Sequence, residues 1–283
     1  MPITGSTRVF FIIGDPVAQV RAPEVYNHLF QRHGVDAVLV PLKLPAAALP
    51  GFIGHGLAAE NVGGLWATIP HKAGLFALID RCDAVAQVAG AVNAVRRNAD
   101  GTLEGALFDG LGFVKGLDHF GIEVAGRRVL VVGAGGGAHA VAAAIAQRGP
   151  AELAVFNRTA ERSEALVARL RPLVGEAARV AATSDAAGYD LIVNCTSQGL
   201  KPEDALPFDP AVADAGAAVV DIIMTRQPNA LLRACTARGI QAHAGYEMLV
   251  QQVPLYLRFF GMAEIAQTLE QDMSEVRALL APR

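Results

Sequence analysis

The chain has 283 residues, with 24 Lys and Arg against 27 Asp and Glu and a formal net charge of −3. That length exceeds one average domain, so we expect two domains. The balanced charge, with no basic block, argues against nucleic acid as a partner. No apolar run reaches 18 residues, which argues against a membrane span.

The cysteines and the start of the chain suggest a cellular compartment. Cys82, Cys195 and Cys235 are odd in number and scattered, without a C-x-x-C pair. The first residues lack the apolar core of a signal peptide. We therefore expect a cytoplasmic protein with reduced thiols and no metal site.

The first third of the chain alternates apolar runs and turn residues. Pro23 suits the start of a helix, with Val25, Leu29 and Phe30 on its apolar face and an end near Gly34. If Pro23 is the first helical residue, Ala22 is the N-cap, a position where Ser is better by about 0.5–2 kcal/mol. The other expected elements are strands at 9–13, 38–42 and 63–67, helices after 42 and 70, and a hairpin of 91–96 with 103–108.

Beyond about residue 110 the pattern becomes strand, helix, strand, which is typical of a doubly wound α/β sheet. We expect strands at 128–133, 152–156, 190–194, 218–222 and 240–243. From Gly245 to the end the apolar residues follow a helical period.

A glycine-rich turn follows the strand at 128–133. A β-branched run that stops at glycines and continues into an alanine-rich helix is typical of a dinucleotide phosphate site. Glycine allows the tight turn and the close approach of a pyrophosphate. The predicted cofactor contacts here are Gly133, Gly135, Gly136, Gly137 and Ala138.

The end of the next strand bears on the choice of cofactor. Asn157, Arg158 and Thr159 stand where an NAD site would place an acidic residue on the ribose 2′-hydroxyl. An Arg fork suits a 2′-phosphate, and no carboxylate is present to repel it. The pattern favours NADP over NAD, although a solvated Arg at a strand end is the alternative.

Three polar residues of the first domain lie at expected strand ends, where α/β sheets collect ligands. Lys72 could exchange protons if a partly desolvated cleft lowers its pKa. Asp109 is its natural carboxylate partner, and Asn93 is an amide in an apolar segment. Each also has an ordinary structural explanation as a solvated lysine, a turn or a core hydrogen bond.

With these residues in place, the chain resembles the shikimate/quinate dehydrogenase family along nearly its whole length. The resemblance depends on the order and spacing of several short motifs. They are Gly14-Asp-Pro16, Pro23 with Asn27, Thr68-Ile-Pro-His-Lys72, Gly90-Ala-Val-Asn93, Asp109-Gly110, Gly133-Ala-Gly-Gly136, Asn157-Arg-Thr159, Asn194-Cys-Thr-Ser-Gln-Gly199 and the segment from Gly245 to Gln252.

The resemblance implies a fold and a set of roles. It implies an N-terminal α/β substrate domain over 1–109, a Rossmann domain over 110–244, and C-terminal helices over 245–283 that return to the first domain. Lys72 and Asp109 would form the catalytic pair, and Thr68, Asn93 and Gln252 would contact substrate hydroxyls. Further cofactor contacts would come from Thr196, Gly245 and Met248.

The chain departs from the family pattern around the substrate. The family's His-Ser-x-Ser-Pro loop is here Gln19-Val20-Arg21-Ala22-Pro23, so both serines that bind a carboxylate are absent. On an extended segment Arg21 would point away from Val20 and Ala22. The other departures are Tyr26 for His, Trp66-Ala67-Thr68 for Asn-Val-Thr, and Leu107-Phe108-Asp109 for Asn-Thr-Asp.

We therefore interpret the chain as a diverged paralogue that transfers hydride between NADP and a secondary alcohol or ketone of a shikimate-like cyclic hydroxy acid, with altered specificity. An NAD-preferring quinate dehydrogenase and a non-catalytic dinucleotide-binding regulator remain alternatives. The expected partner is a small-molecule substrate, and the expected oligomeric state is monomer or homodimer.

Overall fold

The computed structural model describes residues 2–201, 203–224 and 227–281. The chain divides into two compact units, one of residues 2–108 with 252–280, the other of residues 109–251 with residue 281. Each unit is built on its own six-stranded sheet. Within the described ranges, every helix is too short or too polar to cross a bilayer.

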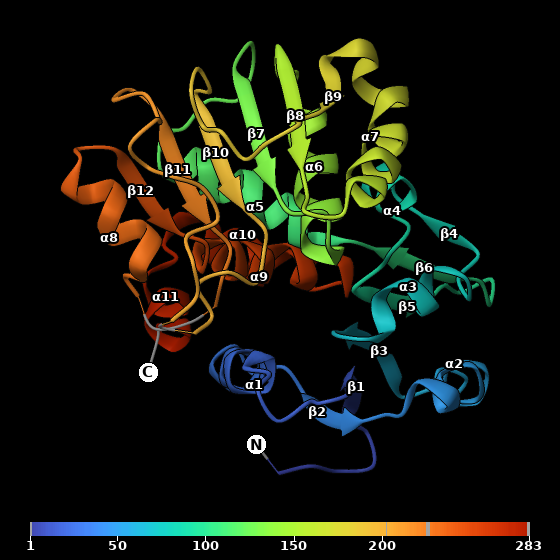
Figure 1. Cartoon of the computed structure of the whole chain (residues 1–283). Coiled ribbons are helices and arrows are strands. Elements are labelled where there is room, and N and C mark those ends of the chain that lie inside the picture. The colour runs from blue at the N-terminus through green and yellow to red at the C-terminus, as the bar shows by residue number, and fades with distance from the viewer. Residues whose placement is uncertain (1, 202, 225–226, 282–283) are drawn as a thin grey trace. The chain divides into compact units, whose positions relative to one another are not determined.

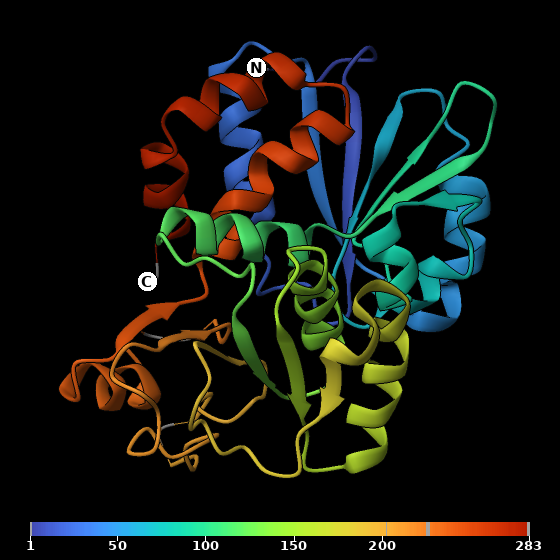
Figure 2. The same cartoon turned by 90° about the horizontal axis from the view of Figure 1, so that it is seen from above.

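The first unit contains a mixed sheet with the order β2-β1-β3-β5-β6-β4. Strand β1 pairs in parallel with β2 and β3, whereas β5 runs antiparallel to both β3 and β6. In Figure 2 the red C-terminal helices lie beside the blue helix α1, which contacts α11. The strands are β1 (Arg8–Gly14), β2 (Ala37–Lys43), β3 (Val62–Ala67), β4 (Arg81–Cys82), β5 (Ala94–Arg97) and β6 (Leu103–Ala106).

Helices from both ends of the sequence belong to this first unit. From the N-terminal part come α1 (Ala22–Arg32), the 3₁₀ turn at Ala46–Ala48, α2 (Leu49–Gly56), α3 (His71–Phe76) and α4 (Ala84–Ala89). From the C-terminal part come the later residues of α9 (Glu247–Phe259), together with α10 (Ala263–Gln271) and α11 (Ser274–Leu280). The expected return of the C-terminal helices to the first domain is confirmed.

The second unit contains an all-parallel sheet with the order β12-β11-β10-β7-β8-β9, visible as neighbouring arrows in Figure 1. The order reverses between β7 and β10, where doubly wound sheets bind ligands. The strands are β7 (Arg128–Val132), β8 (Glu152–Phe156), β9 (Ala178–Val180), β10 (Leu191–Asn194), β11 (Ala218–Asp221) and β12 (Gln241–Ala244). The helices are α5 (Phe108–His119), α6 (Gly136–Ala146), α7 (Ala160–Val174) and α8 (Ala230–Ala237), with a 3₁₀ turn at Gly175–Ala177.

The predicted fold class is confirmed, two local predictions are wrong, and two short strands were not predicted. The second hairpin arm ends at Ala106, so Phe108 and Asp109 lie in the first turn of α5. Helix α1 begins one residue early, at Ala22 with Arg21 as its N-cap, because proline is also accepted at the second helical position. The short strands β4 and β9 were not predicted.

Gly64 shows how closely the first sheet packs. Its φ is +141°, and a Cβ there would lie 2.5 Å from Cε1 of Phe260 and 2.6 Å from the carbonyl oxygen of Val95. We expect Gly64→Ala to lower the free energy of unfolding by roughly 1–3 kcal/mol, because a neighbour must shift. Gly51→Ala in α2 is the matched control, since a Cβ there meets nothing within 4 Å. Denaturant unfolding that leaves both variants equal would contradict this assignment.

Candidate functional site

The turn after β7 is shaped by Gly133. Its φ is +112°, and a Cβ would lie 2.8 Å from the backbone carbon of Cys195, so the chain accepts only glycine there. Helix α6 then begins after Gly135 with no acidic residue in its first turn. Cβ positions at Gly135 and Gly136 meet nothing within 4 Å. The helix N-terminus therefore presents N–H donors to an open space, as an anionic phosphate requires.

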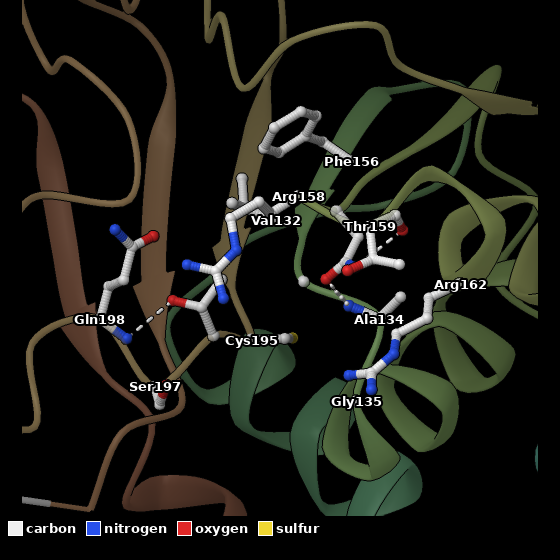
Figure 3. Close-up of a pocket in the computed structure, with 13 residues that line it drawn as sticks. Val132, Ala134, Gly135, Phe156, Arg158, Thr159, Arg162, Cys195, Ser197 and Gln198 are labelled. Atoms are coloured by element: carbon white, nitrogen blue, oxygen red, sulfur yellow. Dashed lines mark hydrogen bonds between the residues drawn. The ribbon is translucent and has the colours of Figure 1, made fainter.

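A cavity of about 390 Å³ lies at the ends of β7, β8 and β10. Asn157 shapes one wall, since its Oδ1 accepts from the Ala134 N–H (3.2 Å) and its Nδ2 donates to the Thr159 carbonyl (2.9 Å). Figure 3 shows the 13 lining residues, which are Val132, Gly133, Ala134, Gly135, Phe156, Asn157, Arg158, Thr159, Arg162, Cys195, Thr196, Ser197 and Gln198.

The lining of this cavity is cationic. Arg158 follows β8 and Arg162 lies on the first turns of α7, and both side chains are drawn in Figure 3. Among the described lining residues there is no carboxylate. Two guanidinium groups without a competing acid suit a phosphate monoester better than a bare ribose hydroxyl.

A buried amide network holds the opposite wall. Asn194 Oδ1 accepts from the Thr196 hydroxyl (2.7 Å) and backbone N–H (3.0 Å), and its Nδ2 donates to Asp221 (3.1 Å). Asn229 donates to the same carboxylate at 2.7 Å. Burial raises the pKa of Asp221, and the bonds from Asn229, Ile223 and Asn194 oppose that rise. The network fixes the backbone around Thr196 without placing a charge in the cavity.

The remaining predicted cofactor residues fall in two places. Gly136, Gly137 and Ala138 form the first turn of α6, next to the cavity. Gly245 and Met248 line a separate small recess beside Phe113 and Phe120. Sequence reasoning missed Arg162, Ser197, Gln198 and Cys195. Arg162 could have been predicted from the sequence, because it lies three residues after Thr159, the N-cap of α7, and therefore on the same side of the helix as the predicted cofactor residues.

In the first unit, Thr68 and Lys72 lie on either side of one tight turn. The Thr68 N–H donates to Ile13 (2.9 Å) and its carbonyl accepts from His71 (2.9 Å), which starts α3 after β3. The Lys72 carbonyl accepts from Val92 at 3.0 Å, which ties the lysine to the segment of Asn93. Lys72 is half-buried in α3.

Asn93 is buried at the junction of several segments. Its backbone N–H donates to Ala106 (2.9 Å), its carbonyl accepts from Ala67 (2.8 Å), and its Oδ1 accepts from the Phe108 N–H (2.9 Å). The Tyr256 hydroxyl also donates to the Asn93 carbonyl at 3.3 Å. The side-chain oxygen of Asn93 is thus committed to the backbone, and its amide Nδ2 is the group able to donate to a ligand.

Two further predicted residues, Asp109 and Gln252, are buried in helices. Asp109 directly follows Phe108 and is buried in the first turn of α5. Gln252 is buried on α9, four residues before Tyr256, so both lie on one helical face.

The departures from the family pattern come together in space. Tyr26 lies edge-on to Trp66 (4.9 Å between ring centroids), Trp66 stacks on Tyr256 (5.3 Å), and Phe108 lies edge-on to Tyr256 (4.8 Å). We call Tyr26, Trp66, Phe108 and Tyr256 the aromatic cluster. Burial raises the pKa of Tyr26, so its hydroxyl stays neutral. The neighbouring Trp66 indole opposes that rise in pKa, and among the described residues its Nε1 meets no acceptor in full hydrogen-bonding geometry.

The loop before α1 does not have the extended form assumed from sequence. The Val20 N–H donates to Val17 (3.2 Å), and Arg21 has helical dihedral angles (φ −104°, ψ −4°). The Arg21 guanidinium donates to the carbonyls of Leu279 (2.5 Å) and Leu280 (3.1 Å), at the end of α11. Val20 and Ala22 are half-buried, and neither side chain has a hydrogen-bond donor.

Comparison with known proteins is consistent with this geometry. The model of the shikimate dehydrogenase substrate binding domain matches residues 12–95, and that of shikimate/quinate 5-dehydrogenase matches residues 116–202. A shikimate dehydrogenase (NADP⁺) of Rubrobacter xylanophilus is 39% identical over 254 residues, which cover 88% of this chain and 89% of that protein.

Two solved structures are also similar. Shikimate 5-dehydrogenase from Thermus thermophilus, in complex with NADP(H) and shikimate, has 30% identity and a TM-score of 0.79 over 92% of this chain and 98% of that one. Ligand-free 5-ketofructose reductase of a Gluconobacter species has 27% identity and a TM-score of 0.82 over 94% of this chain and 98% of that one.

Arg158 provides a test of cofactor choice. We expect Arg158→Ala to weaken NADP binding by roughly 1.5–3 kcal/mol, the value of hydrogen bonds to a charged group, and to leave NAD binding nearly unchanged. Titration calorimetry with each cofactor measures both. Arg171→Ala is the control, since Arg171 is exposed near the end of α7 and outside the cavity lining. Equal weakening of both cofactors would remove Arg158 from phosphate recognition.

Proposed function

This chain belongs to the shikimate/quinate dehydrogenase family of NAD(P)-dependent oxidoreductases, and we propose that it transfers hydride reversibly between NADP and a secondary alcohol or ketone on a small hydroxylated ring. The observation that carries the choice of cofactor is the cavity beside Gly133, which is lined by two arginines and no described carboxylate.

The residues present fit a bound NADP. The open space at Gly135 and Gly136 would receive the pyrophosphate, and Arg158 and Arg162 would hold the 2′-phosphate. When bound, the cofactor supplies or accepts the hydride. The chain's own contribution is to bind and orient the two reactants and to move a proton.

Lys72 and Asp109 are the proposed acid/base pair. Lys72 would pass a proton to or from the reacting oxygen, and Asp109 would orient the substrate and stabilise the charged lysine. The position of Lys72 supports its role, since its carbonyl accepts from the Val92 N–H (3.0 Å), and Val92 directly precedes the buried Asn93. Thr68, Gln252 and the Nδ2 group of Asn93 would bind substrate hydroxyls.

The substrate preference should differ from that of an enzyme with both loop serines. Val20 and Ala22 offer no hydroxyl, and Arg21 is engaged by Leu279 and Leu280 rather than by a ligand. A carboxylate that loses two donors loses on the order of 1–3 kcal/mol of binding. We therefore propose weak activity on shikimate and better activity on a ligand with apolar surface near Val20, Ala22 and Phe108.

A second candidate is reduction of a ketone on an uncharged sugar. Two observations favour it. The side chains of Val20 and Ala22 carry no hydroxyl that could bind a carboxylate, and the chain is similar to a 5-ketofructose reductase. Turnover of 5-ketofructose, compared with that of shikimate, separates the two. An NAD-preferring quinate dehydrogenase would instead show higher turnover with NAD.

The acid/base role predicts a specific kinetic defect. We expect Lys72→Ala to lower kcat by about 10²–10⁴-fold while cofactor affinity stays nearly intact. Lys43→Ala is the matched control, because Lys43 is an exposed lysine paired with Asp15. Normal turnover by the Lys72 variant on a substrate of the wild-type protein would exclude the proposed role, and would leave the cofactor assignment standing.

The loop can be tested by restoring the hydroxyls. We expect Val20→Ser with Ala22→Ser to improve kcat/KM for shikimate more than it changes the KM for NADP, because only the carboxylate gains donors. Steady-state kinetics with shikimate measure both values. A kcat/KM for shikimate in the ordinary enzyme range of about 10⁴–10⁸ M⁻¹s⁻¹ in the unaltered protein would contradict the proposed preference.

A further inference from the structure

Helix α5 begins with a glycine that packs against the backbone of helix α6. Gly110 lies in the first turn of α5, directly after Asp109, and both residues are buried. A Cβ at Gly110 would lie 2.0 Å from the carbonyl oxygen of Ala140, 2.7 Å from its carbonyl carbon and 2.9 Å from Cβ of Ala144. Among the described glycines, 2.0 Å is the shortest such distance. The two helices thus cross with no room for a side chain at this position.

Backbone freedom does not account for the glycine. Gly110 has the backbone of an α-helix, which other residues also adopt, and alanine there would favour the helix. Two of the three atoms that a methyl group would meet belong to the backbone of α6, so they cannot rotate away. The position therefore requires glycine because α5 approaches α6 so closely.

The crossing is one helical turn from the proposed phosphate site. Ala140 lies in the second turn of α6, and Gly135, the N-cap of α6, lines the cavity. Asp109, Gly110, α6 and the described cavity lining all belong to the second unit, whereas Lys72 belongs to the first. Of the proposed acid/base pair, Asp109 is thus the member that is held by the unit that contains the cavity.

We propose that Gly110 is a positioning residue, which lets α5 rest on α6 and thereby fixes Asp109 relative to the N-terminus of α6. This inference rests on the proposed function, because Gly110 acts through Asp109. Cβ atoms essentially never approach another atom more closely than 3.0 Å, so a methyl group at Gly110 must separate the helices by about 1 Å. A misplacement of about 1 Å can lower the rate by about 10²-fold when two reactants must be aligned.

Gly110→Ala tests the proposal, with Gly51→Ala as the matched control. Both variants place a methyl group on a helical glycine, but a Cβ at Gly51 meets nothing within 4 Å. Calorimetric titration with NADP measures the Kd and the number of binding sites. Steady-state kinetics measure kcat/KM for shikimate or 5-ketofructose, whichever the unaltered protein turns over.

The expected result is a separation of turnover from cofactor binding. We expect Gly110→Ala to lower kcat/KM per NADP-binding site by about 10²-fold, with a nearly unchanged Kd for NADP. The described lining of the cavity includes neither Ala140 nor Ala144, so a shift at the crossing should spare NADP affinity. Gly51→Ala should change neither value.

Normalisation to NADP-binding sites separates positioning from stability. Unfolded protein loses turnover and NADP sites in the same proportion, so it leaves kcat/KM per site unchanged. If Gly110→Ala yields no folded protein, Ala144→Val crowds the same crossing from α6. We then expect kcat/KM per site to fall by about ten-fold, because the displacement is smaller.

Two results would overturn the proposal. One is kcat/KM per NADP-binding site equal to that of the unaltered protein, in Gly110→Ala or, where only that variant folds, in Ala144→Val. The other is a loss of NADP affinity as large as the loss of kcat/KM, which would show that Gly110 supports α6 rather than Asp109. Failure of the proposed function is recognised separately, by the absence of NADP-linked turnover of both shikimate and 5-ketofructose by the unaltered protein.

Discussion

The buried amide Asn93 is the constraint on which the first unit depends. Through its backbone and side chain it joins β3, β6, the start of α5 and helix α9, by way of Ala67, Ala106, Phe108 and Tyr256. A buried polar group destabilises the fold unless it is hydrogen-bonded, and the partners of Asn93 lie on segments that are far apart in the sequence. Loss of the side-chain amide would remove the bond from the Phe108 N–H, whereas the backbone bonds of Asn93 to Ala67, Ala106 and Tyr256 would remain. The proposed chemistry requires that reacting groups be held in place before the substrate arrives.

The residues proposed to bind the cofactor and those proposed to bind the substrate are under different steric constraints. On the cofactor side, Gly133 has no steric alternative, and the Asn194–Asp221–Asn229 network fixes the facing loop. On the substrate side, Tyr26, Trp66 and Phe108 are buried in α1, β3 and α5, so replacement of one ring alone would leave a cavity or a clash. Rings also compensate for lost polar contacts, since each aromatic pair adds about 0.5–1.5 kcal/mol beyond its buried area. A substrate wall can thus change character without loss of stability, provided that its members change together.

Much of this structure could be read from the sequence, and the reasons for the failures are physical. The strand at 152–156 was placed correctly, because a parallel strand buried on both faces is a continuous apolar run. Strands β4 and β9 have two and three residues, too few to establish a period. The hairpin was extended to Phe108 because the apolar pattern continues past the point where α5 begins. The bonds of Arg21 to Leu279 and Leu280 could not be predicted, since these acceptors lie more than 250 residues away in the sequence, whereas its bond to Glu24 is local.

The hydrogen bonds of Arg21 also compensate for the missing side-chain cap at the start of α1. Helix α1 has no side-chain cap, and a missing cap costs about 0.5–2 kcal/mol. The same residue donates to the last carbonyls of α11, which have no partner within their own helix. At the other end of α11, Glu275 is paired with His28 and Arg32 of α1. Helices α1 and α11 thus contact each other at both of their ends, and the loop before α1 is held by its bonds to Leu279 and Leu280. The residue between Val20 and Ala22 is thus a structural contact, and its charge is engaged by the end of α11.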